Sequence, residues 1–140
     1  MSWFRAAIAA VTLCVALSQA GGAAAADMKP EWIGAYGYED GREAVAFYLS
    51  LSQNGQILTG HIDEVQTFGE KSADGALRAK IVGSVDGHKV AFTKTYDGTG
   101  GQSHSVTYRG TLVTDGEYMF MFGTWRLGSE VGSWFASVSD

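Results

Sequence analysis

Cysteine, proline and positive charge are scarce in this chain of 140 residues. It contains 1 Cys and 1 Pro, and its 10 Lys and Arg residues stand against 15 Asp and Glu, so the formal net charge is −5. No run of Lys or Arg occurs, which argues against nucleic acid and anionic membrane surfaces as partners. Pro30 precedes every strand that we expect, so no proline interrupts strand pairing further along the chain.

The N-terminal residues Met1–Ala26 have the features of a secretory signal peptide. Arg5 supplies the initial positive charge, an apolar run covers residues 6–17, and the alanines before Asp27 satisfy the small-residue rule for cleavage. The apolar run is shorter than the roughly 20 residues that a membrane-spanning helix needs. We therefore expect an exported protein, periplasmic or extracellular, that is not membrane-spanning and begins after Ala26. A retained membrane anchor and a lipid anchor on Cys14 are the alternatives.

Removal of this leader also removes Cys14, the single cysteine. An exported chain without cysteine has no disulfide, no thiol nucleophile and no cysteine-ligated zinc, so its stability must come from a hydrophobic core. Hydrophobic residues make up 46% of the chain and aromatic residues 12%, which is enough for one packed domain. We therefore predict a single domain over residues 27–140.

Short turn signals divide this domain into alternating segments. Asn-Gly and Asp-Gly pairs favour tight hairpin turns, and they occur at Asp40-Gly41, Asn54-Gly55, Asp74-Gly75, Asp86-Gly87, Asp97-Gly98 and Asp115-Gly116. Between them apolar side chains recur at every second residue, which is typical of strands with one face on a core. Only residues 42–51 also fit a helical period, and there the strict alternation and the Asn-Gly turn that follows favour a strand.

These segments predict an all-β fold, a single antiparallel up-and-down β-barrel of about eight strands. Closure into a barrel leaves no sheet edge exposed, and glycines inside the expected strands ease the bending. The alternative is a two-sheet sandwich, whose crossings need longer connections than this chain offers. These strand glycines are Gly60, Gly83, Gly110 and Gly123.

Three segments of the second half carry a resemblance to a known family. They are Val90–Tyr96 (VAFTKTY), His104–Gly110 (HSVTYRG) and Gly123-Thr-Trp125. Over about residues 77–138 the chain resembles the avidin-like and lipocalin-like small barrels, called calycins. The resemblance implies a barrel that binds a small molecule at its mouth, with Trp125 at a ligand-facing position. The side chains by which avidins hold biotin do not carry over, since the single asparagine, Asn54, lies in a turn.

Polar residues on the inward faces mark a candidate ligand site at the barrel mouth. Because an unpaired buried charge costs several kcal/mol, Glu64 and Lys94 either reach the solvated rim, form an internal pair or contact a ligand. His104 begins its strand and is expected at the rim. We predict that a small apolar or amphipathic molecule binds in the mouth, and the predicted ligand-binding residues are Tyr36, Glu64, Lys94, Tyr108 and Trp125.

A strand that is apolar on both faces supports a second hypothesis. Phe120 and Phe122 alternate with methionines and are expected to face outward, and Trp134 is expected to do the same because it is out of phase with Phe135. Such a surface is typical of a homo-oligomer or of a protein-interaction or inhibitor-type barrel in the periplasm. A third hypothesis is an enzyme that uses Glu64 for acid–base chemistry together with Lys94.

Motifs for metal, nucleotide or nucleophilic chemistry are not found in the sequence. His61 and Asp63 share a face, but the sequence places no third metal ligand beside them. No glycine-rich loop leads from a strand into a helix, and no Gly-x-Ser-x-Gly occurs. The sequence therefore assigns no catalytic residue, no metal ligand and no cofactor.

Overall fold

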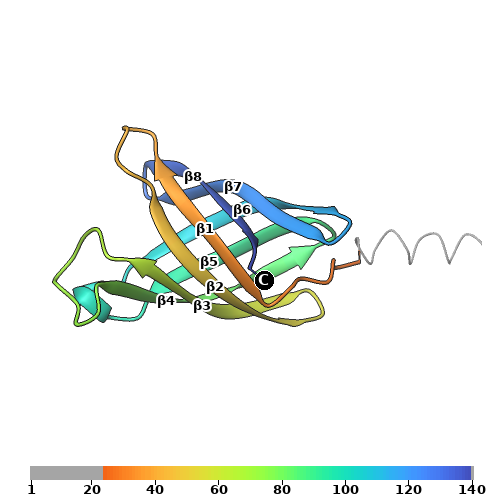
Figure 1. Ribbon diagram of the computed structural model, residues 1–140, viewed down its shortest axis with the longest axis horizontal. Coiled ribbons are helices and arrows are strands. Elements are labelled where there is room, and N and C mark those ends of the chain that lie inside the picture. The colour runs from red at the N-terminus through yellow and green to blue at the C-terminus, as the bar shows by residue number, and fades with distance from the viewer. Residues whose placement is uncertain (1–23, 140) are drawn as a thin grey trace, which may run out of the picture.

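The computed structural model describes residues 24–139, which form eight antiparallel strands closed into one barrel (Figure 1). Each strand pairs with its neighbours in the sequence, and the last strand pairs with the first. This is the predicted up-and-down barrel, so the sandwich alternative is wrong. The strands are β1 Glu31–Tyr38, β2 Val45–Asn54, β3 Ile57–Val65, β4 Ala76–Asp86, β5 Lys89–Tyr96, β6 Ser105–Asp115, β7 Tyr118–Leu127 and β8 Glu130–Val138.

Three other features of the sequence can be compared with this barrel: the leader, the segment with the ambiguous period and the membrane span. The predicted leader, Met1–Ala26, lies outside the described residues up to residue 23. The segment with the ambiguous period is strand from Val45 onward, as the alternation favoured. Within residues 24–139 no helix has the length and apolar character of a membrane span, and the one helix described there is the short 3-10 helix η1, Thr99–Gly101.

One end of the barrel, which we call the closed end, is filled with apolar side chains. The β2–β3, β4–β5 and β6–β7 connections form this end and are short, because glycines such as Gly55 (φ 61°) and Gly87 (φ 59°) adopt the left-handed conformation that tight turns need. Trp32 is completely buried there and its indole N–H donates to the Lys29 carbonyl at 2.7 Å. Fully buried neighbours at this end are Leu49, Leu58, Val85, Leu112 and Met121.

The segment before β1 crosses the closed end. Ala26 donates its backbone N–H to the carbonyl of Gly87 at 3.0 Å. The side-chain amide of Gln53 accepts from the Met28 N–H and donates to the Ala26 carbonyl, each at 2.8 Å. Met28 and the alanines beside it pack against the core. The segment therefore covers the apolar interior at this end.

The inward and outward phase of β8 is opposite to the prediction. Trp134 is buried, with 3% of its surface exposed, whereas Phe135 is 49% exposed. Trp134 pairs with Gly123, and a Cβ atom on Gly110 would lie only 2.6 Å from its ring. Gly110 thus leaves space that the indole fills. Phe122 is 48% exposed and faces outward as predicted.

Candidate functional site

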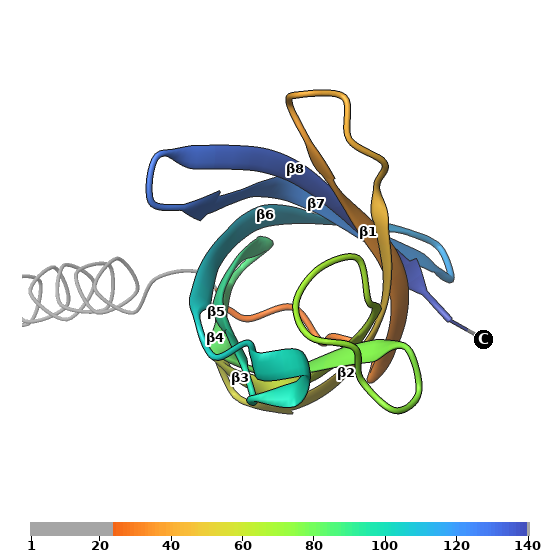
Figure 2. The same ribbon diagram turned by 90° about the vertical axis from the view of Figure 1, so that its left-hand side faces the viewer.

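The opposite end of the barrel, which we call the mouth, contains a cavity of about 460 Å³. The mouth is formed by the β1–β2, β3–β4, β5–β6 and β7–β8 connections, and Figure 2 looks into it past η1 and the β3–β4 loop. The volume lies within the range of small-molecule sites, about 300–1,000 Å³. Aromatic rings dominate its lining: Tyr36, Tyr38, Phe68, Tyr96, His104, Tyr108 and Trp125.

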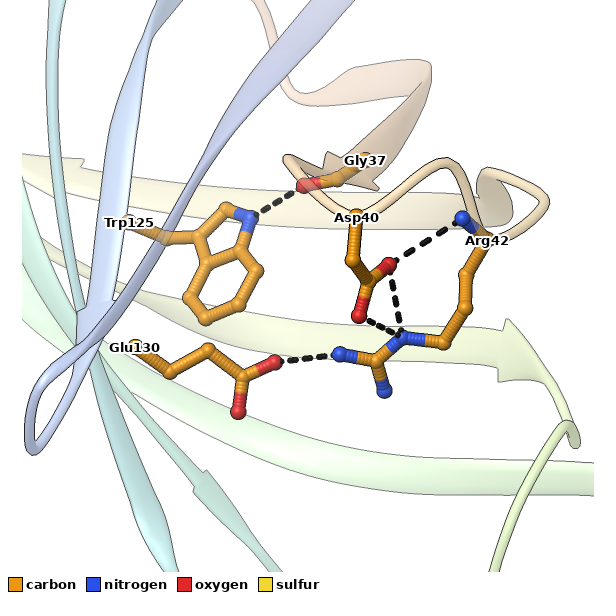
Figure 3. A network of polar contacts seen from close by, with 5 residues as sticks. All are labelled: Gly37, Asp40, Arg42, Trp125 and Glu130. Atoms are coloured by element: carbon orange, nitrogen blue, oxygen red, sulfur yellow. Dashed lines mark hydrogen bonds and ion pairs between the residues drawn. The ribbon is translucent and has the colours of Figure 1, made fainter.

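One wall of the cavity is a fixed cluster of three rings from β1 and β7. The ring of Trp125 meets Tyr36 edge to face at a centroid distance of 6.2 Å and Tyr38 at 5.4 Å. Its indole N–H donates to the Gly37 carbonyl at 2.9 Å (Figure 3). Gly132 lies opposite on β8, where a Cβ atom would come within 2.4 Å of the indole. Packing therefore holds this wall in place before any ligand is present.

A buried ion pair lies in the interior next to the cavity. Glu64 and Lys94 are 2% and 1% exposed, and the Lys94 ammonium donates to Glu64 Oε1. The Tyr36 hydroxyl donates to Oε2 at 2.6 Å and the Tyr96 hydroxyl to Oε1 at 3.0 Å. Both carboxylate oxygens are thus bonded, which offsets the cost of burying the charges. Of the alternatives for this pair, the internal pair is correct and the rim position is wrong.

Burial changes the acid–base behaviour of the groups around this pair. Desolvation lowers the pKa of Lys94, and the negative charge of Glu64 opposes that change. Desolvation and the Glu64 charge both raise the pKa values of Tyr36 and Tyr96 well above the ordinary phenol value. The two phenols therefore remain protonated donors at neutral pH. As an ion pair, Glu64 and Lys94 together contribute no net charge to the interior.

Arg42 fastens the β1–β2 loop across one side of the mouth. Its guanidinium bonds Asp40 Oδ2 at 2.8 Å and Glu130 Oε1 at 2.6 Å, which joins the loop to the β7–β8 hairpin (Figure 3). It also lies over the Tyr38 ring, 3.8 Å from the centroid. The hydrogen bonds to both carboxylates raise the pKa of Arg42. Exposed pairs add little stability, so their effect is to position the loop.

The β3–β4 loop covers the other side. Phe68 from this loop packs against Tyr96 at 5.8 Å and against His104 at 6.1 Å. Gln66 bonds the Phe68 carbonyl at 3.0 Å and the Ser72 N–H at 2.9 Å. The N–H of Glu70 donates to the Gly100 carbonyl at 2.8 Å, which ties the loop to η1. The partly buried His104 lies at the rim, as the sequence indicated.

The five predicted site residues divide into two groups. Tyr36, Tyr108 and Trp125 line the cavity. Glu64 and Lys94 do not line it, and they reach it only through the tyrosines bonded to Glu64. Sequence reasoning missed further lining residues, among them two aromatic residues on strands and two residues in loops. Two of them, Tyr38 and Tyr96, alternate inward and could have been found from the strand period; Phe68 and Arg42 lie in loops that have no period.

This arrangement suits binding more than catalysis. The acid–base pair of the enzyme hypothesis is within hydrogen-bond reach, but Lys94 does not line the cavity and Glu64 has both oxygens bonded within the protein. Among residues 24–139, no group of three or more His, Cys, Asp or Glu side chains could hold a metal ion. Comparison with protein-family models and with curated proteins found no match.

Proposed function

We propose that this protein is an exported barrel that binds a small apolar or amphipathic molecule in the cavity at its mouth. The observation that carries the proposal is the 460 Å³ space lined by seven rings, beside a closed end that is fully packed. A calycin-type barrel would use its mouth in the same way. The compartment expected from the leader is the periplasm or the extracellular space.

Rigid walls favour such binding energetically. Apolar surface removed from water contributes about 25 cal/mol per Å², and association loses part of this to ordering of mobile side chains. The indole of Trp125 is already fixed by the Gly37 carbonyl and by its contacts with Tyr36 and Tyr38. The ligand therefore has little side-chain ordering to impose. More of the free energy gained by burying apolar surface then remains as binding affinity.

Native mass spectrometry of the protein purified from its own source tests this proposal. We expect an adduct of small mass that denaturation releases. Trp125→Ala should lose the adduct, since it removes one wall of the cavity, and Phe122→Ala on the outer face is the matched control that should keep it. The proposal would be contradicted if the wild-type protein carries no adduct and no aromatic probe changes its fluorescence. N-terminal sequencing of the same sample tests export.

The outer face of β7, β8 and β1 supports a second candidate function, self-association. Ile33, Phe122 and Phe135 are each about half exposed there, and the ring of Phe120 lies 6.3 Å from those of Phe122 and Phe135. Residues 32–38, 118–125 and 131–138 contain no Asp, Glu, Lys or Arg. Two copies that each carry a net negative charge meet with least repulsion through such a face.

Light scattering coupled to size exclusion tests self-association. We expect a dimer that Phe122→Ser converts to a monomer, because an exposed ring at the centre of the face is lost. Val82→Ser is the control, since Val82 is 63% exposed on β4, away from this face. A wild-type monomer at high concentration would contradict this second candidate without affecting the first.

A further inference from the structure

The polar groups around the cavity divide into those already bonded within the protein and those that are available to a ligand. Trp125 donates its N–H to Gly37, and the hydroxyls of Tyr36 and Tyr96 donate to Glu64. The guanidinium of Arg42 is bonded to Asp40 and Glu130. A ligand could recruit the indole and phenol donors only by breaking bonds that hold the site together, and at Arg42 it would compete with two carboxylates that already bond Nε and Nη2.

The available groups that are at least partly buried are two phenol hydroxyls, an imidazole and the Gln102 amide, whereas Thr67 and Glu43 of the lining are exposed. Tyr38, Tyr108 and His104 line the cavity, and their side chains make no hydrogen bond to any residue within 24–139. No polar side-chain atom of the described chain is buried without a partner, so the hydroxyl of the otherwise buried Tyr108 opens onto the cavity. Phenol hydroxyls and imidazole both donate and accept hydrogen bonds. A hydroxyl or a carbonyl on the ligand is therefore the fitting partner.

The aromatic faces that attract organic cations already hold one. The Lys94 ammonium lies 4.6 Å from the ring centroids of Tyr36 and Tyr96 and 5.7 Å from that of Tyr108. Such contacts are the recognition mode of aromatic cages for ammonium groups. The ring faces that a second cation would use are therefore already occupied by this ammonium. The cage therefore disfavours a cationic ligand.

An anion is disfavoured for the complementary reason. The two cations near the cavity, Lys94 and Arg42, are both paired with carboxylates, and the exposed Glu43 adds a further negative charge to the lining. An anion in the cavity would lose its hydration without gaining a counter-charge, which is costly. Of the three charge types, only a neutral molecule loses nothing on this account.

We infer that the occupant is an uncharged, planar aromatic molecule with a hydroxyl or carbonyl group directed at Tyr108. Planarity follows from the lining, because flat rings on opposite sides, Tyr38 with Trp125 and Phe68 with His104, offer faces and edges for stacking. The inference rests on the proposed function, since it names the class of molecule that the cavity takes.

Calorimetric titration with four matched probes tests the inference. The probes are 2-naphthol, naphthalene, the 2-naphthoate anion and the 2-naphthyltrimethylammonium cation, which share one ring system. We expect 2-naphthol to bind at least about tenfold more tightly than either ion, because the cation finds the ring faces already occupied by the Lys94 ammonium and the anion finds no unpaired positive charge. Tighter or equal binding of an ion would overturn the inference. Failure of all four probes would also overturn the inference, but it would leave the proposed function standing if native mass spectrometry shows an adduct. Absence of both an adduct and any probe binding would overturn the proposed function itself.

Tyr108→Phe locates the hydrogen bond. We expect this variant to bind 2-naphthol about five- to tenfold more weakly, the effect of one hydrogen bond, and to bind naphthalene as the wild type does. Unchanged naphthalene binding also shows that the cavity has kept its fold. Tyr118→Phe, at an exposed tyrosine of the closed end, is the matched control. An equal loss of affinity for both probes would overturn the assignment of Tyr108.

Discussion

The closed end and the mouth of the barrel are made from the same eight strands, yet their interiors are opposite in kind. At the closed end Trp32, Leu58 and Met121 are buried without remaining exposure. At the mouth the interior holds a cavity, rings and the buried pair of Glu64 and Lys94. One barrel can thus have two kinds of interior along its axis, with a packed core at one end and a cavity at the other, where we propose that recognition takes place.

Connection length follows the same division. At the closed end the strands are joined by tight turns, as between Asn54 and Ile57. At the mouth, longer segments join β1 to β2, β3 to β4 and β5 to β6. Only the longer segments can place side chains such as Arg42 and Phe68 over the opening.

The largest effect is expected from Trp32→Ala at the closed end. The change removes a completely buried indole and leaves a cavity, which costs about 3–5 kcal/mol of unfolding free energy. Urea unfolding measures the loss. Because the closed end is remote from the cavity lining, the folded fraction should bind 2-naphthol as the wild type does. A destabilisation below about 1 kcal/mol, or a parallel loss of binding, would show that the two ends do not divide the tasks.

The sequence was sufficient for the strands and the barrel because alternation is a local signal. Residues 45–51 and 77–85 show it clearly. Alternation failed at β8, since Trp134 and Phe135 are both apolar and the period alone does not say which one faces inward. Gly110 on β6, which has no Cβ where the Trp134 indole packs, favours the observed phase, and this information lies on another strand.

The candidate site was less predictable for a related reason. Glu64 and Lys94 stand on β3 and β5, with β4 between them, so no spacing within one strand brings them together. Arg42 and Glu130 are 88 residues apart. The sequence did place three of its five chosen residues on the cavity wall, because inward-facing aromatic residues near strand ends gather at an end of the barrel.

A smaller effect for each group is expected from alkaline pH, which acts on the buried phenols near the mouth. Burial raises the pKa values of Tyr36, Tyr96 and Tyr108, so above about pH 10 the unfolded chain releases phenol protons that the folded chain retains. The contribution of the buried phenols to the free energy of unfolding is thus fully present below pH 10. It falls as the pH rises above that value, by about 1.4 kcal/mol per pH unit for each phenol. Lys94, whose pKa burial lowers, acts in the opposite direction below that pH.

Tyr36→Phe should make this alkaline decline shallower by the share of one phenol. Urea unfolding at a series of pH values between 9 and 11 measures the slope, with Tyr118→Phe as the control that keeps the wild-type steepness. Trp32→Ala should shift the whole curve downward without changing its slope, since the closed end has no titrating group in its core. A slope that Tyr36→Phe leaves unchanged would argue against the buried network as its source.

The smallest effect is expected from Arg42→Ala, which releases the loop clasp at the mouth. Arg42 is about half exposed, and so are Asp40 and Glu130, so urea unfolding should barely change. The affinity for 2-naphthol should fall by no more than about fivefold, because the Tyr38 ring loses the guanidinium that covers it.

Salt should weaken 2-naphthol binding by the wild type and leave binding by Arg42→Ala unaffected, since only the wild type has the Arg42 ion pairs that salt screens. Arg109→Ala, on the outer face of β6, is the control that keeps wild-type affinity and its salt response. A hundredfold loss in Arg42→Ala would mean that the guanidinium contacts the ligand itself, and the mouth would then recognise charge after all.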